Sequence, residues 1–356
     1  MPSDSTLTLF IPDLFGFQPT LSKLSQEEKA QLPETRFPTL EKWLSRGTKQ
    51  KLTEKNDIVF SEFGLSLENN DEKNKDKPYA ALSLLAEDNQ NLKEANLYWL
   101  RADPVYMQPD RDTVLLTAHE ELALTQEEAN KLVEIINAHF VDEPWTLYAF
   151  DPHRWYLGLE KSADLITHPL TNVLGKNINH FMSTGEDAKY WLGVSNEIQM
   201  LLHGSNVNFE RDSRNMLTAN SVWLWGGGYL PESNNLNSHY KKIITNNIIF
   251  AGIGHHCELD VLPLDDDYLS HIEDGTNFVV LDMLSDSLQN RDLYTFMQIL
   301  NEIEVEFLTL CNKLLENKKI DTLKLIIDDE IIITVTKKQL GHWWKRIKPF
   351  ADFKYA

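Results

Sequence analysis

The sequence predicts an α/β protein in which both ends of the chain contribute strands to one sheet and an α+β unit is inserted between them. Short apolar runs alternate with amphipathic helices near both ends, as in layered folds with a buried sheet. The middle third instead combines strands and helices in a compact mixture. We therefore expect a core of residues 1–94 and 236–356 and an inserted α+β subdomain of residues 95–235.

The chain begins with the order strand, loop, helix. An apolar run at residues 7–11 predicts a buried strand that stops at Pro12. Pro38 then opens a short helix whose apolar residues share one face, and Gly47 ends it. This order is typical of the first unit of an α/β core.

Two helices of the middle third are predicted from their first turns. Thr125 with Glu128 and Ser183 with Glu186 have the spacing of capping boxes, and each pair precedes an apolar stripe. The second helix is expected to end at His203. Between the two helices, residues 145–150 and 154–160 predict a β-hairpin.

The last third returns to apolar strands and one long helix. Residues 248–253 and 278–281 are expected to form buried strands, and an apolar stripe over residues 293–314 predicts the helix. Residues 323–327 and 331–335 are the final predicted strands. Their alternation matches that at the beginning of the chain, which is why one shared sheet is expected.

The charge of the chain excludes some partners. The formal net charge is −20, from 34 basic and 54 acidic residues. Such a surface repels phosphate backbones and anionic lipids, so we expect neither nucleic acid nor a membrane as a partner. An anionic ligand would have to be held by a local group of arginines.

The cysteines and the apolar runs indicate the compartment. Cys257 and Cys311 lie in apolar segments without a spaced motif, so reduced thiols in the core are expected. The first apolar run is too short for the core of a signal peptide, and no run approaches the length of a membrane-spanning helix. We expect a cytoplasmic protein.

Residues 205–231 contain one candidate ligand surface. Arginine and asparagine side chains precede an apolar strand that ends in three glycines, and such side chains offer donors suited to an anion. A tight turn held by bonds between asparagine and the backbone explains the pattern nearly as well. The candidate residues are Asn208, Arg211, Asn220, Gly226, Gly227 and Gly228.

A second basic group comes from the strands of the inserted unit. Arg101, Arg111 and Arg154 could converge on a carboxylate or a phosphate, with Asp103 as a further candidate for the site. The alternative is structural, because aspartates beside these arginines could form internal ion pairs that orient loops.

Several aspartates lie where predicted strands of the core end. Carboxylates delivered by separate loops at one sheet edge are the usual ligands of a hard divalent cation. Aspartate is also the commonest turn residue, so both interpretations stay open. The candidate metal ligands are Asp13, Asp286, Asp328 and Asp329, with Asp282 at the end of another predicted strand. By contrast, His255, His256 and Cys257 favour a structural role, because no second ligand cluster lies nearby.

Four segments carry a resemblance to known proteins: LRADPVYMQPDRD, DPHRWYL, EIQMLLHGSNVN and NFERDSRNMLTANSVWLWGGGYLP. They resemble a proteobacterial family of RpfE-type regulatory, phosphoglycerate-mutase-like proteins. The whole chain is more distantly similar to archaeal-type cofactor-independent phosphoglycerate mutases of the alkaline phosphatase superfamily. This resemblance implies an alkaline-phosphatase-like core, and it places the first metal-binding aspartate of those enzymes at Asp13.

The same resemblance implies an eroded catalytic site. Lys77 and Pro78 stand where the mutases have a serine nucleophile followed by an aspartate. Asp286 is kept, but Asn290 replaces a histidine, and Asp328 is followed by another aspartate instead of a histidine. A two-metal phosphotransferase needs its nucleophile and both cations together, so the remaining oxygens suit at most one cation such as Mg²⁺ or Mn²⁺.

Three functions follow as hypotheses. The first is a regulatory or metabolite-binding pseudoenzyme that takes a phosphorylated or carboxylated small molecule. The second is an active metal-dependent phosphomutase or phosphatase, whose nucleophile would be Ser61, Ser66 or Ser83. The third is a protein-interaction module in which tryptophans mark the partner surface, namely Trp223, Trp225, Trp343 and Trp344. For Trp343 and Trp344, the structural alternative is a C-terminal helix docked on the domain.

Overall fold

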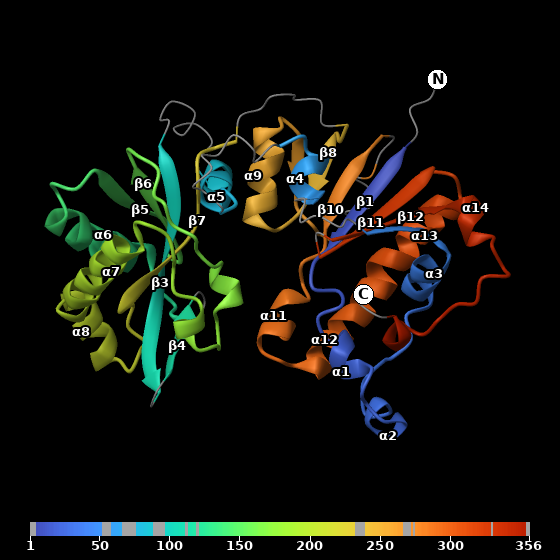
Figure 1. Ribbon diagram of the computed structural model, residues 1–356, viewed down its shortest axis with the longest axis horizontal. Helices are drawn as coiled ribbons and strands as arrows, with labels where there is room; N and C mark the ends of the chain where they lie inside the picture. The colour runs from blue at the N-terminus through green and yellow to red at the C-terminus, as the bar shows by residue number, and fades with distance from the viewer. Residues whose placement is uncertain are drawn as a thin grey trace. The chain divides into compact units, whose positions relative to one another are not determined.

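The computed structural model describes residues 5–51, 58–65, 76–87, 97–110, 113–118, 121–231, 239–265, 272, 275–328 and 330–353. The chain forms two compact units (Figure 1). The first unit contains Met1–Leu65 and Asn234–Ala356, and the second contains Ser66–Ser233.

The first unit is built on a mainly parallel sheet to which both chain ends contribute. Strand β1 (Thr6–Ile11) lies between β10 (Asn277–Val280) and β11 (Thr322–Ile327) and is parallel to both. The order of the described strands is β2-β12-β11-β1-β10-β8-β9. The remaining strands are β8 (Lys242–Ile244) and β9 (Asp260–Leu262), which are parallel, and β12 (Ile331–Thr336) and β2 (Thr48–Lys51), which form the antiparallel edge.

Helices cover both faces of this sheet (Figure 1). On one face, α3 (Pro38–Arg46), α12 (Leu293–Glu302) and α13 (Thr309–Glu316) bury their apolar stripes in the main core. On the other face, Phe250 of α9 (Ile248–His256) packs on Phe10 and Phe278. The shorter helices are α1 (Gln18–Leu21), α2 (Gln26–Lys29), α4 (Ile58–Glu62), α11 (Ser285–Gln289) and α14 (Lys337–Leu340).

The long C-terminal helix contains a π-helical segment, Ile303–Leu308, between α12 and α13. Its buried Glu304 accepts hydrogen bonds from the backbone N–H groups of Thr39 and Leu40, at 2.6 and 3.0 Å. These N–H groups lie in the first turn of α3, where they have no partner inside their own helix. The Glu304 carboxylate also lies at the positive end of the helix dipole, so it caps α3 from a distant part of the chain.

The second unit is an antiparallel sheet with helices on both faces. Its long central strand β3 (Tyr98–Asp110) pairs with β4 (Thr113–Ala118), β6 (Arg154–Leu159) and β7 (Ser221–Gly228), and β6 pairs with β5 (Trp145–Asp151). Helices α6 (Gln126–His139) and α7 (Ala188–His203) pack on one face, next to α8 (Asn206–Ser213), and α5 (Tyr79–Glu87) packs on the other. Single 3-10 turns are Leu170–Asn172 and Ile178–His180.

Most predicted elements are present, but three expectations are wrong. Residues 248–253 form the start of α9 instead of a strand, because the Asn247 side chain accepts hydrogen bonds from the N–H groups of Ile249 and Phe250 and caps a helix. Ser183 and Glu186 do not cap the next helix, which begins at Ala188. Residues 343 and 344 lie outside any helix, after α14.

The α/β class with a large sheet built by both chain ends is confirmed. The boundary between the two units falls after Leu65, so α5 belongs to the second unit. None of the helices in the described ranges is long and apolar enough to cross a membrane.

Candidate functional site

Three aspartates follow neighbouring parallel strands of the first unit. Asp13 comes after β1, Asp282 after β10 and Asp328 directly after β11. The carboxyl ends of parallel strands meet at one sheet edge, where α/β proteins hold their ligands. The placement of these aspartates therefore follows from the fold.

Asp13 and Asp328 are in direct contact. The backbone N–H of Asp13 donates a 2.5 Å hydrogen bond to Oδ1 of Asp328, and Ser285 Oγ donates to Oδ2 of Asp13 at 2.6 Å. Both aspartates adopt left-handed backbone conformations, with φ of 61° and 52°. Aspartate tolerates this conformation better than most residues. Thus the two sharp turns bring the carboxylates together at the edge of the sheet.

Burial raises the pKa of Asp328 to about 7, and the nearby charge of Asp13 acts in the same direction. The hydrogen bond from the Asp13 N–H opposes this shift because it favours the ionised carboxylate. The Asp328 carboxyl can therefore exchange its proton near neutral pH. It is also a group that a bound cation would keep ionised.

The other candidate ligands do not complete a cluster. Asp282 Oδ2 accepts a hydrogen bond from Asn247 Nδ2 at 2.8 Å, and Asp286 lies in the first turn of α11. Within the described ranges, no three His, Cys, Asp or Glu residues form a group that could hold a metal ion. Asp329 lies outside the described residues. Asp13 and Asp328 are thus the pair that the structure brings together.

The glycines at the end of β7 pack against the start of α5. A Cβ atom at Gly228 would lie 2.5 Å from Cβ of Pro78, and one at Gly226 would lie 3.1 Å from Cβ of Tyr79. Gly226 also has a positive φ of 68°. Close backbone approach is thus the reason for these glycines in the structure. Gly227 is equally close to its neighbours, since a Cβ there would lie 2.4 Å from the Tyr98 hydroxyl.

Asp76 fixes the segment that precedes α5. Its carboxylate accepts hydrogen bonds from the backbone N–H and the hydroxyl of Thr167, and Thr167 Oγ1 accepts from the N–H of Gly226. Burial raises the pKa of Asp76, although the bonds from Thr167 oppose the shift. Lys77 and Pro78 follow directly, so this network positions the segment in which the resemblance expects a nucleophile.

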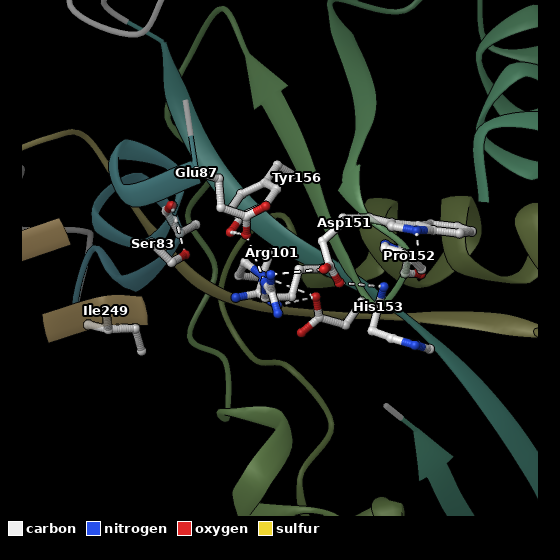
Figure 2. Close-up of polar contacts among 12 residues, drawn as sticks. Ser83, Glu87, Arg101, Asp151, Pro152, His153, Tyr156 and Ile249 are labelled. Carbon is white, nitrogen blue, oxygen red and sulfur yellow. Dashed lines mark hydrogen bonds and ion pairs between the residues drawn. The ribbon is translucent and has the colours of Figure 1, made fainter. Parts of the chain in front are cut away.

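Arg101 lies beside Tyr156 (Figure 2), and Arg154 shares the carboxylate of Glu87 with the Tyr156 hydroxyl. The Arg101 guanidinium lies over the Tyr156 ring, with Cζ 4.9 Å from the ring centroid. Arg154 Nε donates to Oε1 of Glu87 at 2.8 Å, and the Tyr156 hydroxyl donates to the same oxygen at 2.5 Å. We call Glu87, Arg101, Asp103, Arg154 and Tyr156 the arginine cluster.

Each arginine in this cluster has a carboxylate partner. Arg101 Nε and Nη2 donate to Oδ1 of Asp103 at 2.9 and 2.6 Å, and both residues are buried. Arg154 also pairs with Asp151 at 2.9 Å. Burial acts to lower the pKa of Arg154, but the bond and charge of Glu87 outweigh it, so the pKa is raised. The structure thus contains the internal ion pairs that were the structural alternative, and Arg111 lies outside the described residues.

The candidate polar side chains of residues 205–231 mainly form hydrogen bonds with other parts of the second unit. Arg211 is fully buried and donates to the carbonyl oxygens of Leu217 and Leu122 and to Oε2 of Glu128, the last at 2.8 Å. Asn208 Nδ2 donates to the carbonyl oxygens of Leu202 and Ala219. In addition, Asn220 bonds both backbone groups of Met107 in β3. The expected open surface of donors is not formed by Asn208 and Arg211, because their donors are directed at the chain itself.

The alternative nucleophiles are hydrogen-bonded within their own helices. Ser61 Oγ donates to the carbonyl oxygen of Ile58 at 2.8 Å, and buried Ser83 Oγ donates to that of Ala80 at 3.2 Å. Ser66 lies outside the described residues. A hydroxyl tied to its own helix is a poor nucleophile without an adjacent base.

The tryptophans fall into two groups. Trp223 and Trp225 are buried, and Trp225 Nε1 donates to Oδ2 of Asp103 at 2.7 Å. Trp343 and Trp344 are 81% and 64% exposed. The expectation of a docked C-terminal helix is therefore wrong at these two residues, and their role as a partner surface stays a prediction.

The sequence did not point to several residues that shape these sites. Asp76 precedes α5 and Glu87 is its last residue, Ser285 opens α11, and Asn247 caps α9. Polar residues at helix ends are common, so their types alone carry no functional signal. Only the tertiary contacts reveal their roles.

Comparison with known proteins supports a distant relationship to phosphoglycerate mutases. The chain is 25% identical over 146 residues to the 2,3-bisphosphoglycerate-independent phosphoglycerate mutase of Methanosarcina acetivorans, with 40% of this chain and 37% of the relative aligned. It is 25% identical over 174 residues to the probable enzyme of the same name from Geobacter sulfurreducens, with 46% and 42% aligned. The aligned part thus spans less than half of these relatives. No family model matches the chain.

Two solved structures are similar over nearly the whole chain. The PH0037 protein of Pyrococcus horikoshii has a TM-score of 0.50 at 11% identity, covering 94% of this chain and 88% of that one. The cofactor-independent phosphoglycerate mutase of Thermoplasma acidophilum has a TM-score of 0.45 at 13% identity, covering 98% and 94%. The first of these supports the fold and no activity. The chain is distantly similar in sequence to cofactor-independent phosphoglycerate mutases, and the RpfE-type resemblance stays a prediction.

Proposed function

We propose that this phosphoglycerate-mutase-like chain is a pseudoenzyme that binds an anionic metabolite and acts in regulation. The observation that carries the proposal is the set of contacts made by the aspartates at the carboxyl edge of the sheet in the first unit. There, Asp13 and Asp328 bond to each other, and the neighbouring Asp282 accepts a bond from Asn247. A site for two cations needs several ligands that converge on a common point.

The segment before α5 supports the same proposal. Lys77 and Pro78 occupy the place that the resemblance gives to a nucleophilic serine and its aspartate. Gly228 lies against Pro78, and Asp76 is bonded to Thr167. The contacts of this segment are therefore structural. Neither Lys77 nor Pro78 can accept a phosphoryl group as a serine does.

The arginine cluster is the proposed anion site. It combines two guanidinium groups with the Tyr156 hydroxyl, and Arg154 is about one-third exposed. An anion that replaces Glu87 at Arg154 would receive charge-assisted hydrogen bonds of the kind that select carboxylates and phosphates. A phosphorylated or carboxylated small molecule is the proposed ligand, and one divalent cation such as Mg²⁺ or Mn²⁺ at Asp13 and Asp328 is compatible with it.

A thermal-shift screen of the whole purified chain tests this function. We expect 3-phosphoglycerate or a dicarboxylate such as malonate to raise the melting temperature, with and without Mn²⁺. The increase should be lost in Arg154→Gln and kept in Arg214→Gln, because Arg214 is exposed and pairs only loosely with Glu210. If no anion raises the melting temperature, or if Arg154→Gln keeps the increase, the arginine cluster is not the site.

A further inference from the structure

A large pocket lies within the second unit, and none of its lining residues belongs to the arginine cluster. It has a volume of about 1200 Å³ and is formed by α7, the 3-10 turn at residues 178–180, and residues of β3, β4 and β7. Ligand pockets usually measure about 300–1000 Å³, so this one has room for a sizeable small molecule.

The walls of the pocket are mainly apolar. Trp191, Val222 and Leu224 are buried side chains at its wall, and they belong to the core of the unit. Three further lining residues are large and exposed, namely Met182, Leu192 and Met200, at 38%, 46% and 77%. Clustered exposed apolar side chains around a concave surface are typical of a binding site.

The packing of α7 does not account for the exposure of Leu192 and Met200. The helix already buries Trp191, Val194, Ile198 and Leu202 as its core face. The pocket face is a second stripe along the same helix, and it includes Leu192, Ser195, Gln199 and Met200 at helical spacing. Leaving apolar area in water is unfavourable, at about 25 cal/mol per Å². A ligand that covers this second stripe would remove that cost.

The charge of the lining indicates the sign of the ligand. Its ionisable residues are Lys189 and His203, and none of the described residues that line the pocket is acidic. In the whole chain acidic residues outnumber basic ones, 54 to 34. A pocket without described carboxylates in such a chain is locally complementary to an anion.

The positions of these two residues indicate the shape of the ligand. Lys189 and His203 are at opposite ends of α7, fourteen residues apart, which corresponds to about 21 Å along a helix. Between them the lining is apolar or uncharged, and Gln199 Nε2 is already bonded to Ser221 Oγ at 3.1 Å. The pocket thus suits an elongated apolar body with an acidic group at one end.

We propose that this pocket binds an amphipathic anion, such as a monocarboxylate with an alkyl chain. The site is separate in its residues from the arginine cluster, so the inference goes beyond the proposed function. The basic lining residues Lys189 and His203 favour such an anionic ligand as the occupant of the pocket.

The test compares decanoate with decanol, its neutral analogue of equal chain length, on the full chain by isothermal titration calorimetry. We expect decanoate to bind more tightly than decanol by about tenfold, the effect of one charge-assisted hydrogen bond. The double variant Lys189→Gln, His203→Gln should remove this difference and leave decanol binding unchanged. Lys161→Gln, an exposed lysine outside the pocket lining, is the matched control and should behave as the wild type.

A filled pocket provides the second test. Ser195→Trp should abolish binding of both decanoate and decanol. If circular dichroism shows that this variant is unfolded, Leu192→Asp is used in its place. The proposal is overturned if both ligands bind equally to wild type, if neither binds, or if the filling variant binds as well as wild type. It is also overturned if light scattering shows a dimer that Leu192→Asp dissociates, since a second copy would then cover the pocket.

Discussion

Single buried or partly buried polar side chains account for much of the organisation of both candidate sites. Asp328 and Arg211 are bonded to residues distant in the sequence, and Arg101 packs against the rings of Tyr156 and Trp225 in other strands. Breaking such a pair leaves the other partner buried and unsatisfied, which costs more than the net gain from forming the pair. The free energy of unfolding of variants at these residues therefore shows whether a side chain has a structural role or is available for a ligand.

The raised pKa of Asp328 predicts a specific dependence of stability on pH. Because the pKa is about 7 in the folded chain and about 3.9 in an unfolded one, ionisation disfavours folding, and stability falls as pH rises from about 4 to 7. Asp328→Asn keeps an acceptor for the Asp13 N–H and removes the charge. We expect the variant to be more stable than wild type at pH 8 by roughly 1–3 kcal/mol, and equally stable near pH 4.

Urea denaturation at pH 4, 6 and 8 measures this difference. Asp352→Asn, which changes an exposed carboxylate of the same unit, is the control and should show no such trend. A stability difference that does not grow with pH between 4 and 8 would contradict the raised pKa of the partly buried Asp328.

Arg211 gives the second prediction at this scale. It is fully buried and bonded to two carbonyl oxygens and Glu128, so Arg211→Ala should lower the free energy of unfolding by about 3 kcal/mol or more. Arg214→Ala should change it by less than about 0.5 kcal/mol, because that side chain is exposed. Chemical denaturation measures both. Unchanged stability in Arg211→Ala would restore Arg211 as a candidate ligand residue.

At the scale of elements, the glycines of β7 show how a strand end and a helix start fit together. Gly228 lies against Pro78 at the beginning of α5, whereas Gly193 in the middle of α7 has no atom within 4 Å of an added Cβ. Substitution by alanine should therefore lower the stability of the chain at Gly228 and raise it at Gly193. At Gly228 it introduces a clash, and at Gly193 it removes the entropic cost of a glycine in a helix.

We expect Gly228→Ala to lower the melting temperature and to cost roughly 1–3 kcal/mol. Gly193→Ala should raise stability by up to about 1 kcal/mol. Differential scanning calorimetry of both variants distinguishes these effects. Equal stability of Gly228→Ala and wild type would mean that the glycines are not needed for this packing and are free for another role.

Elements with strong local patterns could be predicted from the sequence, and short apolar elements could not. The Thr125 capping box gave the start of α6, and Pro38 and Gly47 gave the ends of α3. Residues 248–253 were mistaken for a strand because a short apolar run does not show whether it is a strand or a buried helix. The three-residue strand β8 lies in a segment that resembles a polar linker, so it was missed.

For the whole molecule, the fold was more predictable than the site. Alternating strands and helices at both chain ends sufficed to predict the shared sheet, because the fold class follows from the pattern of elements. Pairing of Arg101 and Arg154 with neighbouring aspartates was one of the two interpretations, but Glu87 as a further partner of Arg154 was not predicted. Glu87 comes from α5, and no local pattern links that helix to β6. Polar pairing between distant elements depends on tertiary contacts, so the pair of Arg154 with Glu87 could not be predicted from the sequence.

The central claim for the whole molecule is the loss of phosphoryl transfer. The most direct test is an assay for the conversion of 3-phosphoglycerate to 2-phosphoglycerate by the purified full chain with Mn²⁺, using the Methanosarcina acetivorans mutase as the positive control. We predict no turnover above that of Asp13→Ala, since Lys77 and Pro78 supply no phosphoryl acceptor. Turnover that depends on Mn²⁺ and disappears in Asp13→Ala would contradict this account and identify the chain as an active mutase.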